Sequence, residues 1–509
     1  MLLEETLQHQ PFLAFPPYIN RSKREALAEL GRPCSRFKNP LGIEERLGLF
    51  LAGKMSNVDL LDNVTQVIAS GVPLNWQAIL RYLEKKNVVV SPNFRFAKSN
   101  NDLPKFWQIG LETNRERDTD GLDVKGGGFS HSHSVETAMS KSVGEALERH
   151  FLTLYRNEKL PRMTSTEMRA AGSPVLDVSE QSTFLPWQVE ANPRLHVSPS
   201  SPFSWVTAER MDGGVVHVPA QMVFWNYDFS RDMEEPVLLN TTTSGAGGHF
   251  TKKEAVLSGL LELIERDGFL IYWLNGIAPN RIDARSARNT ELFKFLAATE
   301  RYGLEAHFLD ITSDIGIPTA LCVIIDPRAN DPVLAMGASA GIDAEGNMLH
   351  AGYEALAVLT TSLQLEQFRL PKEYKPFSDK KIGRSERLSL WRGKDMLERF
   401  AFFLQGRAVS IETFARTIQV DDSAEAHLAY VLGKLKEKGA GYEVYVYEVQ
   451  HEVLRELGYH VVKTIVPRLI PLYLFEHLPA LGATRLREAA RTLGYTPAEH
   501  FVPWPHPFP

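Results

Sequence analysis

The sequence predicts a mixed α+β fold, in which a small, mainly helical module precedes a larger domain of mixed sheets and long helices. Residues 41 to about 90 have a helical pattern, and from about residue 115 strand-like segments alternate with long helices. The composition, with 44% apolar and 23% charged residues, is that of a globular protein. We therefore expect an N-terminal module over 1–110 and a second domain over 115–509.

The N-terminal module contains two helical patterns and a short strand. The first helix is expected over 57–71, between a capping Asn and a Gly, and the second over 75–87, ahead of a strand at 88–90. Helix, helix and strand in this order are typical of a winged-helix-like module. A helical cap on the larger domain has the same pattern, so both interpretations stay open.

In the larger domain, segments rich in β-branched and aromatic residues predict strands at 213–225, 321–327, 442–449 and 460–467. Long helices lie between them. Two stretches, 160–206 and 370–390, are rich in Pro, Ser and charged residues, which indicates surface loops.

Charge and cysteine content exclude several classes of protein. The net charge of −6 gives no reason to expect a nucleic-acid partner. Cys34 and Cys322 provide neither a disulfide framework nor an all-cysteine zinc site, and they suit buried thiols in a reducing compartment. The N-terminus lacks a signal pattern, and no apolar run approaches the roughly 20 residues that span a bilayer. We expect a cytoplasmic protein without a membrane partner.

Two expected helices carry the same spacing of carboxylates. In "SVGEALERHF" (142–151), Glu145 and Glu148 are three residues apart, so they share a helix face, and an arginine follows them. The segment 252–269 repeats this spacing with Glu262 and Glu265, and Glu254 lies about 80° away around the same helix.

An apolar stripe beside the second set of glutamates predicts that this helix is well buried. Carboxylates at the edge of such a stripe are costly unless a cation neutralises them. Two pairs of glutamates suit a hard cation such as Mg²⁺, which usually also holds a nucleotide phosphate, and Arg149 and Arg266 could bind phosphate oxygens. The alternative is that each motif lies on an ordinary solvated helix.

Glycine-rich segments, at 123–134 and 240–250, precede both helices. Glycines allow backbone N–H groups to approach phosphates. Neither segment fits the P-loop or the dinucleotide-binding pattern, so a nucleotide site here is of another kind. His131 and His133 alternate and would point in opposite directions on a strand, which argues against a zinc site.

These features, together with the proline-alternating end "PWPHPFP" (503–509), resemble the YcaO family over residues 115–509. The resemblance implies an ATP- and Mg²⁺-dependent cyclodehydratase that forms thiazolines or oxazolines from Cys, Ser or Thr of a ribosomal precursor peptide. Such enzymes belong to synthetase complexes that make bacteriocin- or microcin-like natural products. Alternatives within the family are thioamide or amidine formation and a non-catalytic ATP-binding scaffold subunit.

The resemblance also implies roles for individual residues, carried over position by position. The Mg²⁺ ligands are Glu145, Glu148, Glu262 and Glu265, assisted by Glu254 at both metal and nucleotide. The phosphate contacts are Arg149, Arg266 and Lys125, with Ser130 as a weaker candidate. The catalytic tail is Pro505, Pro507 and Pro509, which would present the chain terminus to the peptide.

Four positions depart from the family pattern, and they put nearby nucleotide contacts in doubt. Ser244 replaces an asparagine, Phe250 a polar residue, His350 an arginine and Ala357 a glutamine, whereas Glu354 is retained. The chain contains no adenylating-enzyme-like segment and no flavin motif. We therefore expect a separate leader-binding partner and a separate flavin-dependent dehydrogenase, unless the N-terminal module captures the leader. A homodimer is compatible with the sequence.

Overall fold

A computed structural model describes residues 74–96, 107–113, 116–117, 123–124, 127–132, 134–155, 159–178, 183–229, 234–327, 332–416 and 418–509. The expected helix over 57–71 and the residues Cys34, Lys125 and His133 lie outside these ranges. The chain divides into two compact units. The first contains the described residues up to Thr113 with those from Gly127 to Ala146, and the second contains the segments 116–117 and 123–124 with those from Leu147 to Pro509.

The first unit is built on a three-stranded antiparallel sheet of order β1-β2-β5. Its elements are α5 (Leu74–Lys85), β1 (Val89–Phe96), β2 (Trp107–Thr113), β5 (Gly127–Ser132) and the first part of α6 (Val135–Phe151). The helix expected over 75–87 and the strand that follows it are confirmed.

The second unit contains a six-stranded sheet of order β6-β7-β15-β16-β9, with β8 paired to β7. All of its pairings are antiparallel. The strands are β6 (Arg162–Thr164), β7 (Pro202–Arg210), β8 (Val215–Pro219), β9 (Ala246–His249), β15 (Tyr445–Glu448) and β16 (His460–Ile465). The strands expected at 442–449 and 460–467 are therefore confirmed. The strand expected at 213–225 is confirmed only over Val215–Pro219, because Ala220–Met222 form a short 3-10 helix.

A second sheet of the same unit has the order β13-β12-β11-β10-β14 and is mixed, because β10 and β14 run parallel. Its strands are β10 (Asn280–Ile282), β11 (Glu305–Asp310), β12 (Thr319–Asp326), β13 (Val333–Ala340) and β14 (Ala408–Val409). Every residue of β12 is buried, as its apolar run predicts. Cys322 lies on this strand as a buried free thiol, and burial raises its pKa. A short pair, β3 (Glu116–Arg117) and β4 (Asp123–Val124), is separate.

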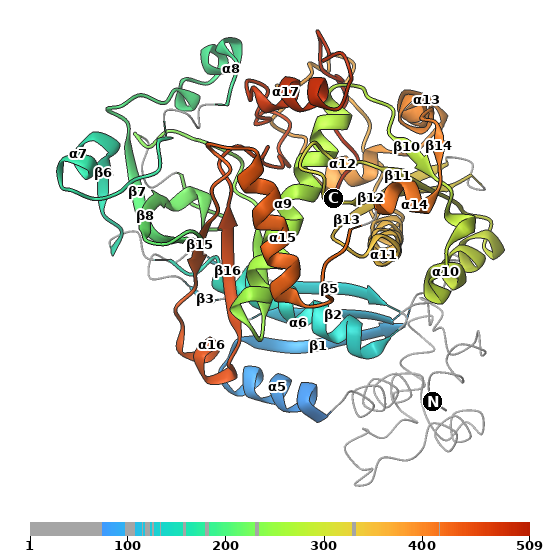
Figure 1. Ribbon diagram of the computed structural model, residues 1–509, viewed down its shortest axis with the longest axis horizontal. Helices are drawn as coiled ribbons and strands as arrows, with labels where there is room; N and C mark the ends of the chain where they lie inside the picture. Colours follow the sequence, from blue (N-terminus) through green and yellow to red (C-terminus); the bar gives the residue numbers. More distant parts are fainter. Residues whose placement is uncertain are drawn as a thin grey trace, which may run out of the picture. The chain divides into compact units, whose positions relative to one another are not determined.

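Helix α9 (Lys252–Leu274) contacts both sheets of the second unit, through β9 and β16 on one and β12 and β13 on the other. Figure 1 shows it running through the unit beside α15. The other helices of the unit are α7 (Ser165–Ala170), α8 (Pro186–Ala191), α10 (Thr290–Arg301), α11 (Ala344–Ser362), α12 (Arg384–Leu390), α13 (Lys394–Phe400), α14 (Ile411–Ala415), α15 (Ala424–Glu437), α16 (Glu452–Leu457) and α17 (Arg485–Thr492). None of the described helices is long and apolar enough to cross a bilayer.

The two stretches expected to be surface loops are only partly so. The first contains β6, α7, α8 and the start of β7, and the second contains α12, whose Arg387 is completely buried. The expectation for 370–390 failed because a charged residue can be buried when a distant partner neutralises it. Here that partner is Glu476.

Candidate functional site

Both carboxylate-bearing helices follow a glycine strand that packs directly on the helix backbone. A side chain at Gly128 of β5 would collide with the carbonyl of Ser142 on α6. Likewise, a side chain at Gly247 of β9 would collide with Ala255 of α9, and one at Gly259 with the carbonyl of Gly245. Close backbone contact therefore explains these glycines, whereas their sequence alone indicated an approach to phosphate.

The two strand–helix pieces also have the same internal spacing. Gly128 precedes Glu145 by the same interval at which Gly245 precedes Glu262. In the first piece the Ser142 hydroxyl donates to the Gly128 carbonyl over 3.1 Å. Each glutamate pair begins ten residues, or about three turns, after the start of its helix, at 3.6 residues per turn.

Glu262 is held in place by neighbours on both sides. The Gly245 amide donates to its Oε2 over 2.7 Å, and Arg266 Nη2 lies 2.8 Å from its Oε1. Arg266 Nη1 donates to the Ser244 hydroxyl over 2.6 Å, while its Nε is buried without a hydrogen-bond partner in the described part of the chain. One donor of this guanidinium is therefore buried, and no described residue satisfies it.

Glu254 binds two neighbouring side chains at the start of α9. Thr251 caps the helix, and its hydroxyl donates to Glu254 Oε2 over 2.6 Å. The same oxygen lies 2.6 Å from Nδ1 of His249. Glu254 therefore stabilises the first turn, where an acidic side chain also suits the helix dipole.

Glu148 and Arg149 lie in the last turn of α6, which belongs to the second unit. A side chain at Gly248 of β9 would lie 3.0 Å from Glu148 Oε1 and 2.9 Å from the Tyr459 hydroxyl, so glycine leaves room for both. Burial, and to a lesser extent the charge of Glu148, raises the pKa of Tyr459. The Arg149 guanidinium lies over the ring of Trp225 at 5.8 Å.

The other predicted site residues differ in how far their side chains are buried. Glu265 is half-buried on α9, and Glu145 is half-buried on the part of α6 in the first unit. The buried Ser130 hydroxyl donates to the carbonyl of Ala138. His350 and Glu354 are exposed on α11, and Ala357 is half-buried there. The nucleotide and metal roles assigned to these side chains stay predictions.

Among the described residues, no three His, Cys, Asp or Glu side chains gather closely enough to form a metal cage. Mg²⁺ commonly keeps several waters and takes one or two carboxylates together with substrate phosphates. Single carboxylates on α9 and α6 suit an ion that is bound together with a triphosphate.

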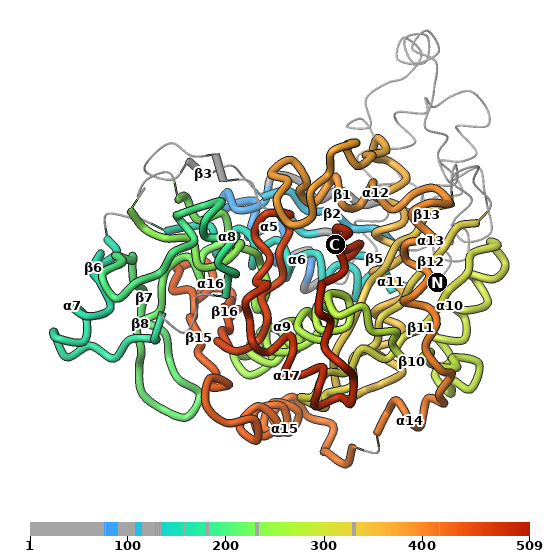
Figure 2. Tube along the Cα trace, turned by 90° about the horizontal axis from the view of Figure 1, so that it is seen from above, coloured from blue at the N-terminus to red at the C-terminus, as the bar shows by residue number. Residues whose placement is uncertain are grey.

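The proline-alternating end is part of the interior of the second unit. Pro505, His506, Pro507 and Phe508 are buried, and Pro509 is half-buried. Figure 2 shows this segment in dark red, leaving α17 and passing α9. The ring of Phe508 lies 4.7 Å from that of Phe269, which is on α9 one turn beyond Glu265.

Hydrogen bonds from distant segments fix the backbone of the tail. The Tyr374 hydroxyl donates to the Pro503 carbonyl over 2.8 Å, and Trp391 Nε1 donates to the Pro505 carbonyl over 3.1 Å. His506 Nε2 donates to the carbonyl of Tyr473 over 2.8 Å. Burial, aided by the charge of Arg387, lowers the pKa of His506 well below its usual value, so its ring is neutral.

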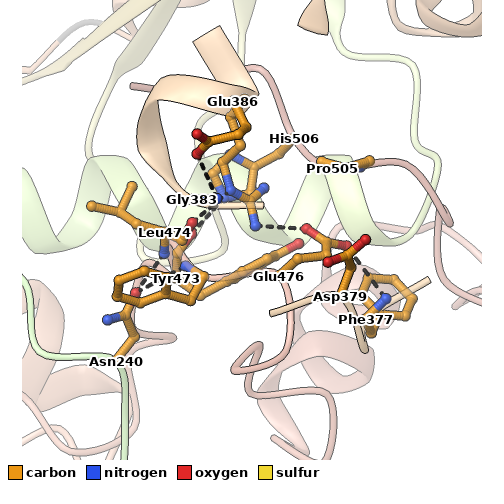
Figure 3. A network of polar contacts seen from close by, with 12 residues as sticks. Asn240, Phe377, Asp379, Gly383, Glu386, Tyr473, Leu474, Glu476, Pro505 and His506 are labelled. Atoms are coloured by element: carbon orange, nitrogen blue, oxygen red, sulfur yellow. Dashed lines mark hydrogen bonds and ion pairs between the residues drawn. The ribbon is translucent and has the colours of Figure 1, made fainter. Parts of the chain in front are cut away.

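A buried ion pair lies behind this part of the tail. Arg387 Nη2 and Glu476 Oε2 are 2.6 Å apart, and both side chains are fully buried. The Tyr374 hydroxyl, whose single proton is shared with the Pro503 carbonyl, lies 3.1 Å from Glu476 Oε1. Figure 3 shows Glu476, Tyr473 and His506 together in this network.

The sequence indicated Ser244 only as a departure from the family pattern, and it gave no role to Lys463, Arg387 or Glu476. Lys463 had a detectable signal, because it is a charged residue within the mainly apolar strand "HVVKTIV". Arg387 and Glu476 had none, since their importance depends on partners far away in the chain.

Comparison with known proteins identifies the family. The model of the YcaO cyclodehydratases, described as ATP- and Mg²⁺-binding, matches residues 130–470. The chain therefore belongs to the YcaO family, and the expected cofactors, ATP and Mg²⁺, are those of the family model. The predicted α+β fold is confirmed as well.

Two curated relatives match part of the chain. An uncharacterised protein of Methanothermobacter thermautotrophicus is 26% identical over 53% of this chain and 66% of its own length. An uncharacterised protein in the tfuA 3′ region of Rhizobium leguminosarum bv. trifolii is 28% identical over 39% of this chain and 45% of its own length. The chain thus spans less than two thirds of either relative.

Solved structures share the fold. A heterocyclase in complex with substrate and cofactor has a TM-score of 0.66 at 18% identity, covering 85% of this chain and 57% of the other. The heterocyclase TruD has a TM-score of 0.56 at 19% identity, covering 73% and 50%. YcaO from Methanopyrus kandleri, bound with AMPPCP and Mg²⁺, has a TM-score of 0.53 at 20% identity, covering 78% and 90%.

Proposed function

We propose that the chain is the ATP- and Mg²⁺-dependent cyclodehydratase of a peptide synthetase complex. It would convert Cys, Ser or Thr of a ribosomal precursor peptide into thiazoline or oxazoline rings. The observation that carries this proposal is the buried proline tail, which packs against α9 one turn beyond Glu265. Such a tail reaches the carboxylate helix from within the same unit.

In the proposed reaction the side-chain thiol or hydroxyl of the peptide attacks the carbon of the preceding amide. A C–S or C–O bond forms, the π electrons of the carbonyl move to oxygen, and the thiol or hydroxyl proton passes to a base. The amide oxygen then takes the γ-phosphoryl group of ATP, and ADP leaves. Loss of the amide N–H proton and departure of phosphate form the C=N bond, so the peptide loses one water.

The chain's own residues would orient the triphosphate and neutralise its charge. Glu148, Glu262 and Glu265 are our proposed Mg²⁺ ligands in the second unit, with Glu145 in the first and Glu254 in support. Arg149 and Arg266 are the proposed phosphate contacts there, and we keep Lys125 and Ser130 as further candidates. When bound, Mg²⁺ would supply positive charge to the phosphoryl oxygens.

The test is peptide mass after incubation with ATP, MgCl₂, a Cys/Ser/Thr-rich precursor peptide and the partner proteins encoded beside the gene. Loss of one water per ring, dependent on ATP, supports the proposal. A gain equal to the mass difference between sulfur and oxygen would instead indicate thioamide formation. Loss of one water together with the disappearance of a free amine of the peptide would indicate an amidine. An unchanged peptide mass, without ATP turnover, would support the scaffold alternative that Phe250, His350 and Ala357 motivate.

Replacing Glu262 with glutamine is expected to lower the dehydration rate by about 100-fold or more, because the variant loses the charge that faces Arg266 and the proposed cation. Rates and Mg–ATP affinity are compared with Glu437→Gln, which removes a carboxylate from an exposed pair with Lys434. Equal dehydration rates for both variants would show that Glu262 has no role at the proposed site.

Adding one glycine after Pro509 is expected to slow ring formation by about 100-fold, since small displacements of reacting groups have effects of that size. Mg–ATP affinity should stay nearly unchanged. Because Pro509 is only half-buried, we also expect a melting temperature close to that of the native chain. Full activity of the extended chain would contradict a role for Pro505, Pro507 and Pro509 at the reacting peptide.

The leader-binding partner and the dehydrogenase also stay proposals. We propose that a separate adenylating-enzyme-like protein captures the leader of the precursor peptide and delivers its core to this chain. A flavin-dependent dehydrogenase would then oxidise the rings. Dehydration that requires the purified partner, and a leader on the peptide, would support this division of labour.

A further inference from the structure

Lys463 is a buried cation in the middle of β16. Lys463 is only 4% exposed, and its Nζ donates a hydrogen bond to the carbonyl of Thr242 over 2.7 Å. Among the described residues, no carboxylate forms an ion pair with it. The charge of its ammonium form is therefore balanced by a single carbonyl and by more distant groups.

Such a lysine costs stability. Burial lowers its pKa to about 7, while the charges of Glu262 and Glu148 partly oppose that effect. An apolar side chain of similar length would avoid the cost of desolvating the amine. Retaining a destabilising group inside the protein is typical of functional sites, where stability and activity compete.

The lysine lines a cavity of about 70 Å³ within the second unit. Thr242 and Ser244 form its polar side with Lys463, whereas Leu238, Leu263 and Ile465 are among its apolar walls. A water needs roughly 10–15 Å³ by this measure, so the cavity has room for about five to seven water-sized groups. Its mainly apolar lining suits an uncharged amide group.

Hydrogen bonds connect this cavity to the carboxylate helix. The Thr242 hydroxyl donates to Ser244 Oγ over 2.7 Å, and the same oxygen accepts a hydrogen bond from Arg266. Arg266 in turn pairs with Glu262. The proposed phosphate contact and the buried lysine thus share one polar wall.

We propose that Lys463 is a catalytic residue that donates a hydrogen bond to the amide oxygen of the peptide when that amide is attacked in the cavity. This inference rests on the proposed function. As the thiol or hydroxyl adds to the carbon, the π electrons move to oxygen, and the ammonium stabilises the resulting negative charge. The oxygen then takes the γ-phosphoryl group of ATP, and its charge passes to the departing ADP.

The experiment compares Lys463→Met with the native chain in two measurements. Without ATP or peptide, we expect the melting temperature of the variant to be equal or higher, because a buried amine is replaced by an apolar side chain. With ATP, MgCl₂, partners and precursor peptide, we expect the dehydration rate to fall by about 100-fold, the effect of removing one oxyanion donor. The KM for ATP should stay within about twofold of the native value.

Two further variants make the outcomes distinct. Lys253→Met removes an exposed lysine that pairs with Glu425, and it should leave dehydration unchanged. Lys463→Arg keeps the charge and should retain more activity than Lys463→Met. A strong drop in melting temperature with activity reduced only in proportion to folded protein would assign Lys463 a structural role. A raised KM for ATP at unchanged kcat would make it a nucleotide contact, and either result overturns the inference.

Failure of the inference differs from failure of the proposed function. If the native chain leaves every precursor peptide unchanged, the proposed function fails and the inference fails with it. If the native chain dehydrates the peptide and Lys463→Met does so at a similar rate, only the inference about Lys463 is wrong.

Discussion

Replacing Phe508 with alanine is expected to lower the free energy of unfolding by about 3–5 kcal/mol, the usual range for a buried aromatic residue. Phe508 is 2% exposed, although it is the penultimate residue of the chain. Its ring lies against Phe269 in a cluster that also contains Trp273 and Trp391. Truncation therefore leaves a cavity in a dense aromatic core. Urea denaturation followed by tryptophan fluorescence measures the change.

The matched control is Phe293→Ala on α10. Phe293 is 62% exposed, so removing its ring should change stability by no more than about 0.5 kcal/mol. Similar unfolding midpoints for the two variants would mean that the end of the chain does not pack as described.

The position of Phe508 changes how the tail can be tested. Deleting the last few residues removes both the proposed catalytic end and a part of the hydrophobic core. A truncated chain that loses activity therefore does not distinguish chemistry from folding. Extension beyond Pro509 leaves Phe508 in place, which makes it the sharper experiment.

Helical periodicity carried most of the correct sequence predictions. An apolar stripe beside Glu262 predicted a buried helix, and α9 is one because its stripe packs on two sheets. The three-residue spacing of Glu262 and Glu265 predicted that they share a face of this helix, with Arg266 directly after them. A local sequence pattern is sufficient to predict such a helix, because the spacing that defines its faces lies within a few residues.

Long-range pairing explains what the sequence could not provide. Arg387 and Glu476 are 89 residues apart, and the charged stretch around Arg387 looked like a solvated loop until its partner was known. The glycines around the start of α9 have a packing role that the sequence did not indicate. Gly247 of β9 leaves room for Ala255 of α9, and Gly259 within α9 leaves room for the carbonyl of Gly245. The approach of this segment to phosphate stays a prediction.

Replacing Arg387 with methionine is expected to destabilise the protein by about 3–5 kcal/mol, because it leaves Glu476 buried without its cation. The same change removes the hydrogen bond from Arg387 Nε to the Leu474 carbonyl, which measures 2.9 Å. The tail should loosen as well, since Tyr374 joins Glu476 to the Pro503 carbonyl. We therefore expect ring formation to decline more steeply with temperature in the variant than in the native chain.

The exposed pair of Arg210 and Asp212, at 2.8 Å, is the control for this change. Arg210→Met should cost at most about 1 kcal/mol, because solvent screens an exposed ion pair. The double variant Arg387→Met/Glu476→Gln should be more stable than Arg387→Met alone, since an uncharged amide no longer needs the guanidinium. Equal stability of the single and double variants would show that the ionic pairing is not what holds this segment.

The pH dependence of Arg387→Met gives an independent check. Burial raises the pKa of Glu476, and Arg387 opposes that rise in the native chain. Without Arg387 the folded variant binds a proton more tightly than the unfolded chain does. Stability then decreases as pH rises above the ordinary glutamate range, and the deficit relative to the native chain should shrink as pH falls from about 7 toward 5. A deficit that is constant over this range would mean that Glu476 does not carry the uncompensated charge, and that lost packing of the Arg387 side chain accounts for the instability.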